Sequence, residues 1–333
     1  MCPINSWLRV GRCLAIPVIL GGQLMAHAGD DTPAGKKGEA GVVLEGHRDG
    51  VFSVLFFNEG RSIASASRDG TIRLFDVASH AEQYALKGHA GQVLRLAMDP
   101  SHHLLASGGE DKTIRIWNLE NQKEVGILRG HEGWVAGVAF SPDGSLLASA
   151  SADKNVKIWD VAKRSELRTL KGHTADVNSV CFSPDGKRVV SAGKDKLIKV
   201  WDVETGKEIL SREGHGQEIF TIVFSRDGSR FATASQDGVI KIWNASTGGE
   251  EKSLKGHQGA VYTIAFGKND TELVSSGADR TVRRWNIERA SEITSWKGHK
   301  NEAYAVAWDA PSNNVISGSQ DRTIRLWKIN KGD

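Results

Sequence analysis

The sequence predicts an all-β protein, a seven-bladed β-propeller, and three observations support this. A Gly-His pair recurs seven times at a constant step of 42 residues, from His47 to His299. An aromatic residue recurs at the same step, first as Phe75 and then as six tryptophans that end with Trp327. Each repeat also holds four short apolar segments separated by turn residues. A fixed period of about 40–45 residues with these marks is typical of a propeller array.

The third repeat shows how turn chemistry divides a blade into four strands. We expect strands at residues 135–140, 146–151, 156–161 and 166–170. The SPDG turn at residues 141–144 separates the first two, because proline presets φ and glycine accepts a positive φ. Short strands at about ten-residue spacing indicate an antiparallel sheet. The sheets are apolar on both faces, so we expect seven of them to stack radially.

The register of the repeats predicts how the ring closes. The last repeat ends shortly after Trp327, which leaves it without a fourth strand. Residues 41–45, before the first Gly-His pair, align with the fourth strand of the other repeats. We therefore expect this N-terminal strand to complete the last blade.

The start of the chain differs from the repeats and predicts export. Arg9 and Arg12 precede an uncharged, mostly apolar run over residues 13–25, and an Ala-His-Ala site follows and ends at Ala28. A basic start, a short apolar core and small residues before the cut are typical of a secretory signal peptide. We therefore expect residues 1–28 to be a signal peptide that is cleaved near Ala28.

This assignment divides the chain into three parts. After the signal peptide, the polar and glycine-rich residues 29–40 are expected to form a flexible leader, and residues 41–333 the propeller. The mature protein would then be periplasmic or secreted. An uncleaved anchor, or a cytoplasmic protein with an incidental apolar start, are the alternatives.

Composition excludes several classes of partner and cofactor. A formal net charge of +3 over 333 residues gives no general attraction to nucleic acid or to an anionic membrane. The apolar run is shorter than the ~20 residues of a membrane helix, so we expect no membrane insertion of the mature protein. The cysteines, Cys2, Cys13 and Cys181, have no metal-binding or haem-binding spacing. We therefore expect neither a metal nor a cofactor.

Four columns recur in the repeats, and a residue that recurs in every blade must serve to build the blade. The histidines are His47, His89, His131, His173, His215, His257 and His299. The turn aspartates are Asp69, Asp111, Asp153, Asp195, Asp237, Asp279 and Asp321. The hydroxyl residues are Ser65, Ser107, Ser149, Ser191, Thr233, Ser275 and Ser317. The aromatic residues are Phe75, Trp117, Trp159, Trp201, Trp243, Trp285 and Trp327.

These four groups predict one structural network per blade. An indole N–H, a hydroxyl, an imidazole and a carboxylate can form one chain of donors and acceptors. Ser, His and Asp also suggest a hydrolase triad, but seven copies of a catalytic site would serve no purpose. Phe75 has no N–H, so we expect the network of the first blade to be the weakest.

The recurring columns resemble the WD-repeat (WD40) β-propeller family, and the resemblance covers residues 41–329. It implies a seven-bladed propeller with one hydrogen-bonded His–Ser/Thr–Asp–Trp tetrad per blade. It also implies a platform for binding other proteins, usually without catalysis.

A further recurring column is basic. We expect its side chains to pack along their strands and to reach water or a carboxylate, rather than to bind a polyanion. The column consists of Arg73, Arg115, Lys157, Lys199, Lys241, Arg283 and Arg325.

Function is expected where the repeats differ on an exposed face. The face that carries the His and Asp loops, called the top face below, holds columns that vary from blade to blade. The residues five positions after His form an aromatic arc in blades five, six, seven and one. The candidate partner-binding residues are Phe52, Trp134, Glu218, Phe220, Tyr262, Glu302 and Tyr304. Aromatic anchors beside charged residues are typical of interface hot spots, although the rings could instead only line and fill the channel wall.

The sequence therefore predicts a monomeric, non-catalytic scaffold that binds a protein or peptide on its top face. The alternative is an enzyme or small-ligand binder that uses the central channel. No cluster of non-recurring His, Asp, Glu or Cys residues supports that alternative.

Overall fold

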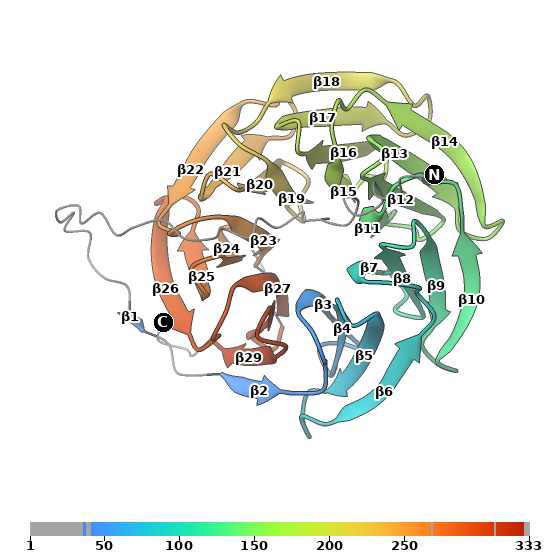
Figure 1. The fold of residues 1–333 in the computed structure, drawn as a ribbon. Coiled ribbons are helices and arrows are strands. Elements are labelled where there is room, and N and C mark those ends of the chain that lie inside the picture. The colour runs from blue at the N-terminus through green and yellow to red at the C-terminus, as the bar shows by residue number, and fades with distance from the viewer. Residues whose placement is uncertain (1–35, 38–40, 268, 310, 330–333) are drawn as a thin grey trace, which may run out of the picture. The chain divides into compact units, whose positions relative to one another are not determined.

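The structure is a computed structural model that describes residues 36–37, 41–267, 269–309 and 311–329. The expected signal peptide (1–28) and most of the expected leader (29–40) lie outside the described residues. Within these ranges the chain forms strands and no helix. The strands make seven sheets that surround a centre like the blades of a propeller (Figure 1). The predicted fold, all-β with seven blades of four antiparallel strands, is confirmed.

The strands follow one another in blade order, from the innermost strand of each blade to the outermost. Blade one holds β3 (Val51–Phe57), β4 (Ser62–Ser67), β5 (Thr71–Asp76) and β6 (Glu82–Lys87). Blade two holds β7 (Val93–Met98), β8 (Leu104–Gly109), β9 (Ile114–Asn118) and β10 (Lys123–Leu128). Blade three holds β11 (Val135–Phe140), β12 (Leu146–Ser151), β13 (Asn155–Asp160) and β14 (Ser165–Lys171). Blade four holds β15 (Val177–Phe182), β16 (Arg188–Gly193), β17 (Leu197–Asp202) and β18 (Glu208–Glu213).

The other three blades repeat this order, except that β1 and β2 come from the part of the chain that precedes blade one. Blade five holds β19 (Ile219–Phe224), β20 (Arg230–Ser235), β21 (Val239–Asn244) and β22 (Glu250–Lys255). Blade six holds β23 (Val261–Phe266), β24 (Glu272–Gly277), β25 (Thr281–Asn286) and β26 (Ser291–Lys297), with β1 (Lys36–Lys37) added in parallel to β26. Blade seven holds β27 (Ala303–Asp309), β28 (Asn314–Ser319), β29 (Ile324–Lys328) and β2 (Val42–Leu44). In blade three, the first two strands match the expected ranges, and β13 begins one residue earlier than expected.

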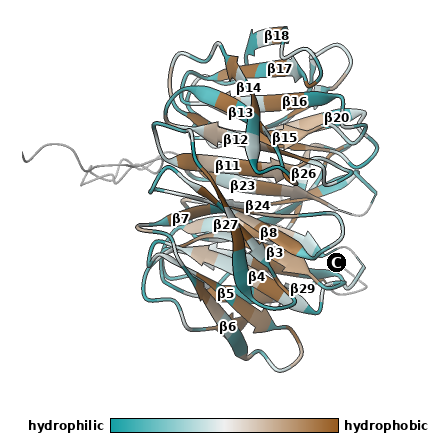
Figure 2. Cartoon of the chain, turned by 90° about the vertical axis from the view of Figure 1, so that its right-hand side faces the viewer, coloured by the Kyte–Doolittle hydropathy of each residue, from teal (hydrophilic) through white to brown (hydrophobic). Residues whose placement is uncertain are grey.

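The hydrophobic core lies between neighbouring blades. One cluster joins Ile114 and Leu128 of blade two to Val135, Leu147 and Trp159 of blade three, and all five are buried. Burial of each such large side chain contributes about 1.5–3 kcal/mol. Brown hydrophobic segments lie within the strands, and teal hydrophilic ones gather in the loops (Figure 2). Each blade therefore needs a neighbour on both sides.

The N-terminal strand β2 lies at the outer edge of the last blade. It pairs antiparallel with β29, with Val42 opposite Leu326 and Leu44 opposite Ile324. The Leu44 side chain is buried in a cluster that spans blades seven and one. How much this pairing stabilises the ring stays a prediction.

Candidate functional site

The recurring polar residues meet inside each blade. In blade three, Trp159 Nε1 donates to Ser149 Oγ at 2.8 Å. Ser149 Oγ lies 2.7 Å from His131 Nε2, and His131 Nδ1 lies 2.6 Å from Asp153 Oδ2. A carboxylate only accepts, so Nδ1 carries the imidazole proton and Nε2 accepts from the hydroxyl. The four groups thus form one continuous chain from the blade interior to the turn.

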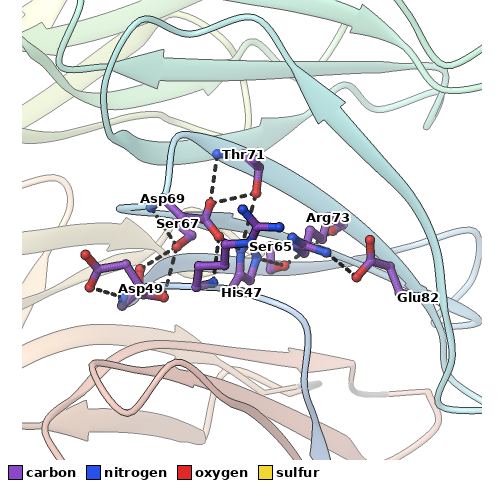
Figure 3. Close-up of polar contacts among 10 residues, drawn as sticks. His47, Asp49, Ser65, Ser67, Asp69, Thr71, Arg73 and Glu82 are labelled. Carbon is purple, nitrogen blue, oxygen red and sulfur yellow. Dashed lines mark hydrogen bonds and ion pairs between the residues drawn. The ribbon is translucent and has the colours of Figure 1, made fainter.

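The same bonds recur around the ring, and the first blade differs. In blades two to seven each Trp Nε1 donates to the hydroxyl at 2.8 Å. In all seven blades the hydroxyl lies 2.7 or 2.8 Å from the histidine Nε2. In blade one, the Ser65 hydroxyl contacts His47 and the Arg73 carbonyl and receives no indole donor (Figure 3). That the network of blade one is the weakest stays a prediction.

The electrostatics of the turn aspartates follow from these contacts. Burial raises the pKa of Asp153, but hydrogen bonds from His131 and from the backbone N–H groups of Glu132 and Asn155 outweigh it and lower the pKa to about 2. The pKa of the corresponding aspartate is lowered in each of the other blades as well. The seven hydroxyl residues are completely buried. A nucleophile must reach its substrate, so this burial is incompatible with a hydrolase triad.

The basic column packs as expected. In six blades the basic residue pairs with a glutamate on the outermost strand, for example Lys157 Nζ with Glu166 Oε2 at 2.7 Å. In blade one this pair is Arg73 and Glu82 (Figure 3). In blade seven the Arg325 guanidinium donates to the Gly41 carbonyl instead. These cations are thus engaged within their own blades.

The residues five positions after the recurring histidines share a structural feature that the sequence alone did not show. Each innermost strand carries an irregularity near its start, where one residue is skipped in the pairing with the next strand. A bulged residue leaves the pleat alternation, and its side chain is re-aimed. The skipped residues are Phe52, Leu94, Ala136, Asn178, Phe220, Tyr262 and Tyr304.

Four of these bulged residues form a continuous row of ring contacts, called the aromatic arc below. The ring centroids of Phe220 and Tyr262 are 5.3 Å apart, as are those of Tyr262 and Tyr304. The rings of Tyr304 and Phe52 are 5.4 Å apart. Phe220, Tyr262 and Tyr304 expose only 8, 5 and 7% of their surface, and Phe52 is half-buried. Much of the ring area is thus used for contacts within the arc.

Two glutamates lie beside the arc. Glu302 Oε2 accepts a 3.0 Å hydrogen bond from the Tyr262 hydroxyl. Glu218 Oε1 accepts a 2.9 Å bond from the Asn178 amide, and burial raises the pKa of Glu218. Trp134, the remaining candidate, is half-buried at the start of blade three and lies outside this row of ring contacts.

Sequence reasoning missed two residues near this site. Asn178 orients Glu218 and also donates to the Ile219 carbonyl at 2.9 Å. Arg95, directly after the bulge of blade two, donates from Nη2 to Thr221 Oγ1 of blade five at 3.3 Å. Asn178 and Arg95 differ in type from the residues at the same position of the other repeats, and this difference could have identified them from the sequence. Within the described ranges there is no group of three metal-ligating side chains, and no helix is long and apolar enough to cross a membrane.

A comparison with protein families decides the family. The description "WD domain, G-beta repeat" matches seven segments, at residues 38–76, 81–118, 122–160, 164–202, 206–244, 248–286 and 290–328. The chain belongs to the WD40 family. WD40 propellers commonly serve as protein-interaction scaffolds and are typically non-catalytic. No curated protein matches the chain at a significant level.

The WD40 repeat is offset from the blade by one strand. The matched segment 122–160 contains β10, the outermost strand of blade two, and then β11 to β13 of blade three. The first match, 38–76, likewise contains β2 and then β3 to β5 of blade one. The outermost strand of blade seven therefore comes from the first repeat.

Proposed function

We propose that this WD40 protein is a non-catalytic scaffold that binds a protein or peptide on its top face, across the aromatic arc. The observation that carries this proposal is that Phe220, Tyr262, Tyr304 and Phe52 are all bulged residues in four consecutive blades. The bulge frees their side chains from the sheet, and tyrosine is a preferred anchor in interfaces.

The charges beside the arc favour a partner segment that carries a lysine or arginine. Glu218 is half-buried with an amide as its hydrogen-bond partner, and its pKa is raised by burial. A cation from the partner would compensate this charge. Glu302 offers a second carboxylate, which accepts the hydrogen bond of the Tyr262 hydroxyl. Trp134 adds a further half-buried aromatic surface on the same face.

Affinity capture tests the proposal. The full chain is the bait, beside a Tyr262→Ala/Tyr304→Ala double variant and a Tyr84→Ala control at an exposed tyrosine of β6. Partner capture is expected to be lost with the double variant and kept with the control, and the melting temperature is measured for each. Intact capture despite lowered stability would show that the rings only pack.

A second pair of variants separates binding from folding. Trp134→Ala leaves the arc contacts in place, and Glu218→Gln keeps the shape of the side chain while removing its charge. Both variants are expected to weaken partner capture without loss of the fold. Added salt should weaken capture by the wild type in the same way as Glu218→Gln, because salt screens the charge of Glu218.

We further propose that the protein is exported as a monomer after cleavage near Ala28. The support lies in the sequence: Arg9 and Arg12, the apolar run at residues 13–25 and the small residue at Ala28. Cell fractionation with sequencing of the mature N-terminus tests export, and a cytoplasmic protein that starts at Met1 would contradict it. Sedimentation of the purified protein tests the oligomeric state.

A further inference from the structure

Arg95 crosses the centre of the ring. It lies on β7 of blade two, and its Nη2 donates to Thr221 Oγ1 on β19 of blade five at 3.3 Å. Blades two and five are not neighbours in the ring (Figure 1). The bond between Arg95 and Thr221 therefore crosses the space that the inner strands enclose. Thr221 Oγ1 gives its own hydrogen to the Tyr262 carbonyl at 2.7 Å and therefore accepts from Arg95.

No other blade has a charged residue at the position of Arg95, six residues after the recurring histidine. The column consists of Ser53, Arg95, Gly137, Ser179, Thr221, Thr263 and Ala305. The hydroxyls in this column bond to the neighbouring inner strand: Ser53 accepts from Leu96 N and Ser179 from Ile222 N, each at 3.2 Å. The Thr221 and Thr263 hydroxyls donate instead, to the Tyr262 and Tyr304 carbonyls at 2.7 and 2.8 Å.

The charge of Arg95 has no carboxylate to neutralise it among the residues that the structure describes. No ion pair involves Arg95 there, and of its five N–H donors one has a protein acceptor. The Cys181 thiol interacts electrostatically with Arg95, but burial raises the pKa of this thiol to about 12, so it is neutral. Burial lowers the pKa of Arg95, but a guanidinium stays protonated at neutral pH. The Arg95 side chain is only partly exposed, and a charge that is partly removed from water favours an anion at its side.

The geometry points to a binding site for a small oxyanion, of carboxylate or phosphate size, on the Arg95 guanidinium at the centre of the ring. A guanidinium presents paired N–H donors that match both anions bidentately. The side chain is partly exposed, so small solutes reach it. We assign a free ion as the occupant, because the guanidinium bonds across the ring, between the inner strands β7 and β19.

Titration with inorganic phosphate and with acetate tests this site. The full-length wild type is compared with Arg95→Gln, Arg95→Lys and the control Arg129→Gln, an arginine exposed on the surface. Melting temperature is followed at constant ionic strength, and calorimetry measures binding directly. Phosphate also stabilises proteins because it is excluded from their surface, and this effect does not saturate. The non-saturating rise in melting temperature should therefore be the same in all four proteins.

The expected result is a saturable rise in melting temperature for wild type and Arg129→Gln, following RT ln(1 + [L]/Kd). Arg95→Gln should lose the saturable part, and Arg95→Lys should bind more weakly, since an ammonium lacks the fork. An equal saturable rise in Arg95→Gln, or none in wild type with either anion, would overturn the site and leave Arg95 as a strut between blades. If Arg95→Gln does not fold, the wild-type calorimetry and Arg95→Lys decide the question.

Discussion

The Tyr262 hydroxyl donates a 3.0 Å hydrogen bond to Glu302 Oε2, which ties the innermost strand of blade six to the loop that begins blade seven. Burial, with the adjacent carboxylate, raises the pKa of Tyr262, so the hydroxyl keeps its proton. The bond fixes the ring of Tyr262 between Phe220 and Tyr304. It also holds the Glu302 carboxylate at the edge of the arc.

Tyr262→Phe isolates this bond, because the ring contacts remain. We expect a loss of about 1 kcal/mol in the free energy of unfolding, the usual net value of a hydrogen bond, measured by urea denaturation. Tyr84→Phe is the matched control, since Tyr84 is exposed on β6. Equal effects of the two variants would mean that the bond to Glu302 contributes nothing to stability.

Glu218 is expected to destabilise the free protein at neutral pH. Its pKa is raised in the folded state, so between the unfolded and the folded pKa the folded chain binds more protons than the unfolded one. Stability therefore falls as pH rises through the folded pKa. Glu218→Gln should raise the melting temperature at pH 7, and the gain should vanish below about pH 4, near the ordinary pKa of a glutamate. Glu132→Gln, at an exposed glutamate, should show neither effect.

Trp159→Phe removes the indole donor of blade three, so that its hydrogen-bond network becomes like that of blade one, which has Phe75 at this position. Ser149 loses its indole donor, and we expect a cost of about 1–3 kcal/mol. A double-mutant cycle with Ser149→Ala separates the bond from the change in ring volume. A coupling energy near zero would show that the indole stabilises the blade by packing alone.

The turn aspartates should make the protein sensitive to acid. The pKa of Asp153 is lowered to about 2, so the unfolded chain binds more protons than the folded one between about pH 4 and pH 2. The contribution of Asp153 is thus present above pH 4 and lost as pH falls through that window. Asp153→Asn should flatten the dependence of melting temperature on pH in this window. An unchanged slope would contradict the role of the His131 bond.

The sequence predicts the features that are repeated in every blade. It does not predict contacts between residues that are far apart in the chain. Strand positions and the order of Phe220, Tyr262 and Tyr304 follow from the 42-residue step, because each blade solves the same packing problem. The bulges at these residues were not predicted, because the innermost strands are apolar at most positions and a break in their alternation does not stand out in the sequence. The bond from Arg95 to Thr221 joins residues that are 126 positions apart, and these residues meet only because the blades close into a ring.

Deletion of residues 41–45 tests whether β2 closes the ring. The deletion removes the outermost strand of blade seven and uncovers the edge of β29, whose Ile324 lies opposite Leu44. It also removes Leu44 from a cluster that holds residues of both blade seven and blade one, so the loss is shared between the first and last repeats. We expect one cooperative transition at a lower melting temperature, and Leu44→Ala alone should cost about 2–5 kcal/mol. Val43→Ala is the control, since Val43 is 40% exposed on the same strand. An unchanged melting temperature after the deletion would mean that seven blades hold together through their faces alone.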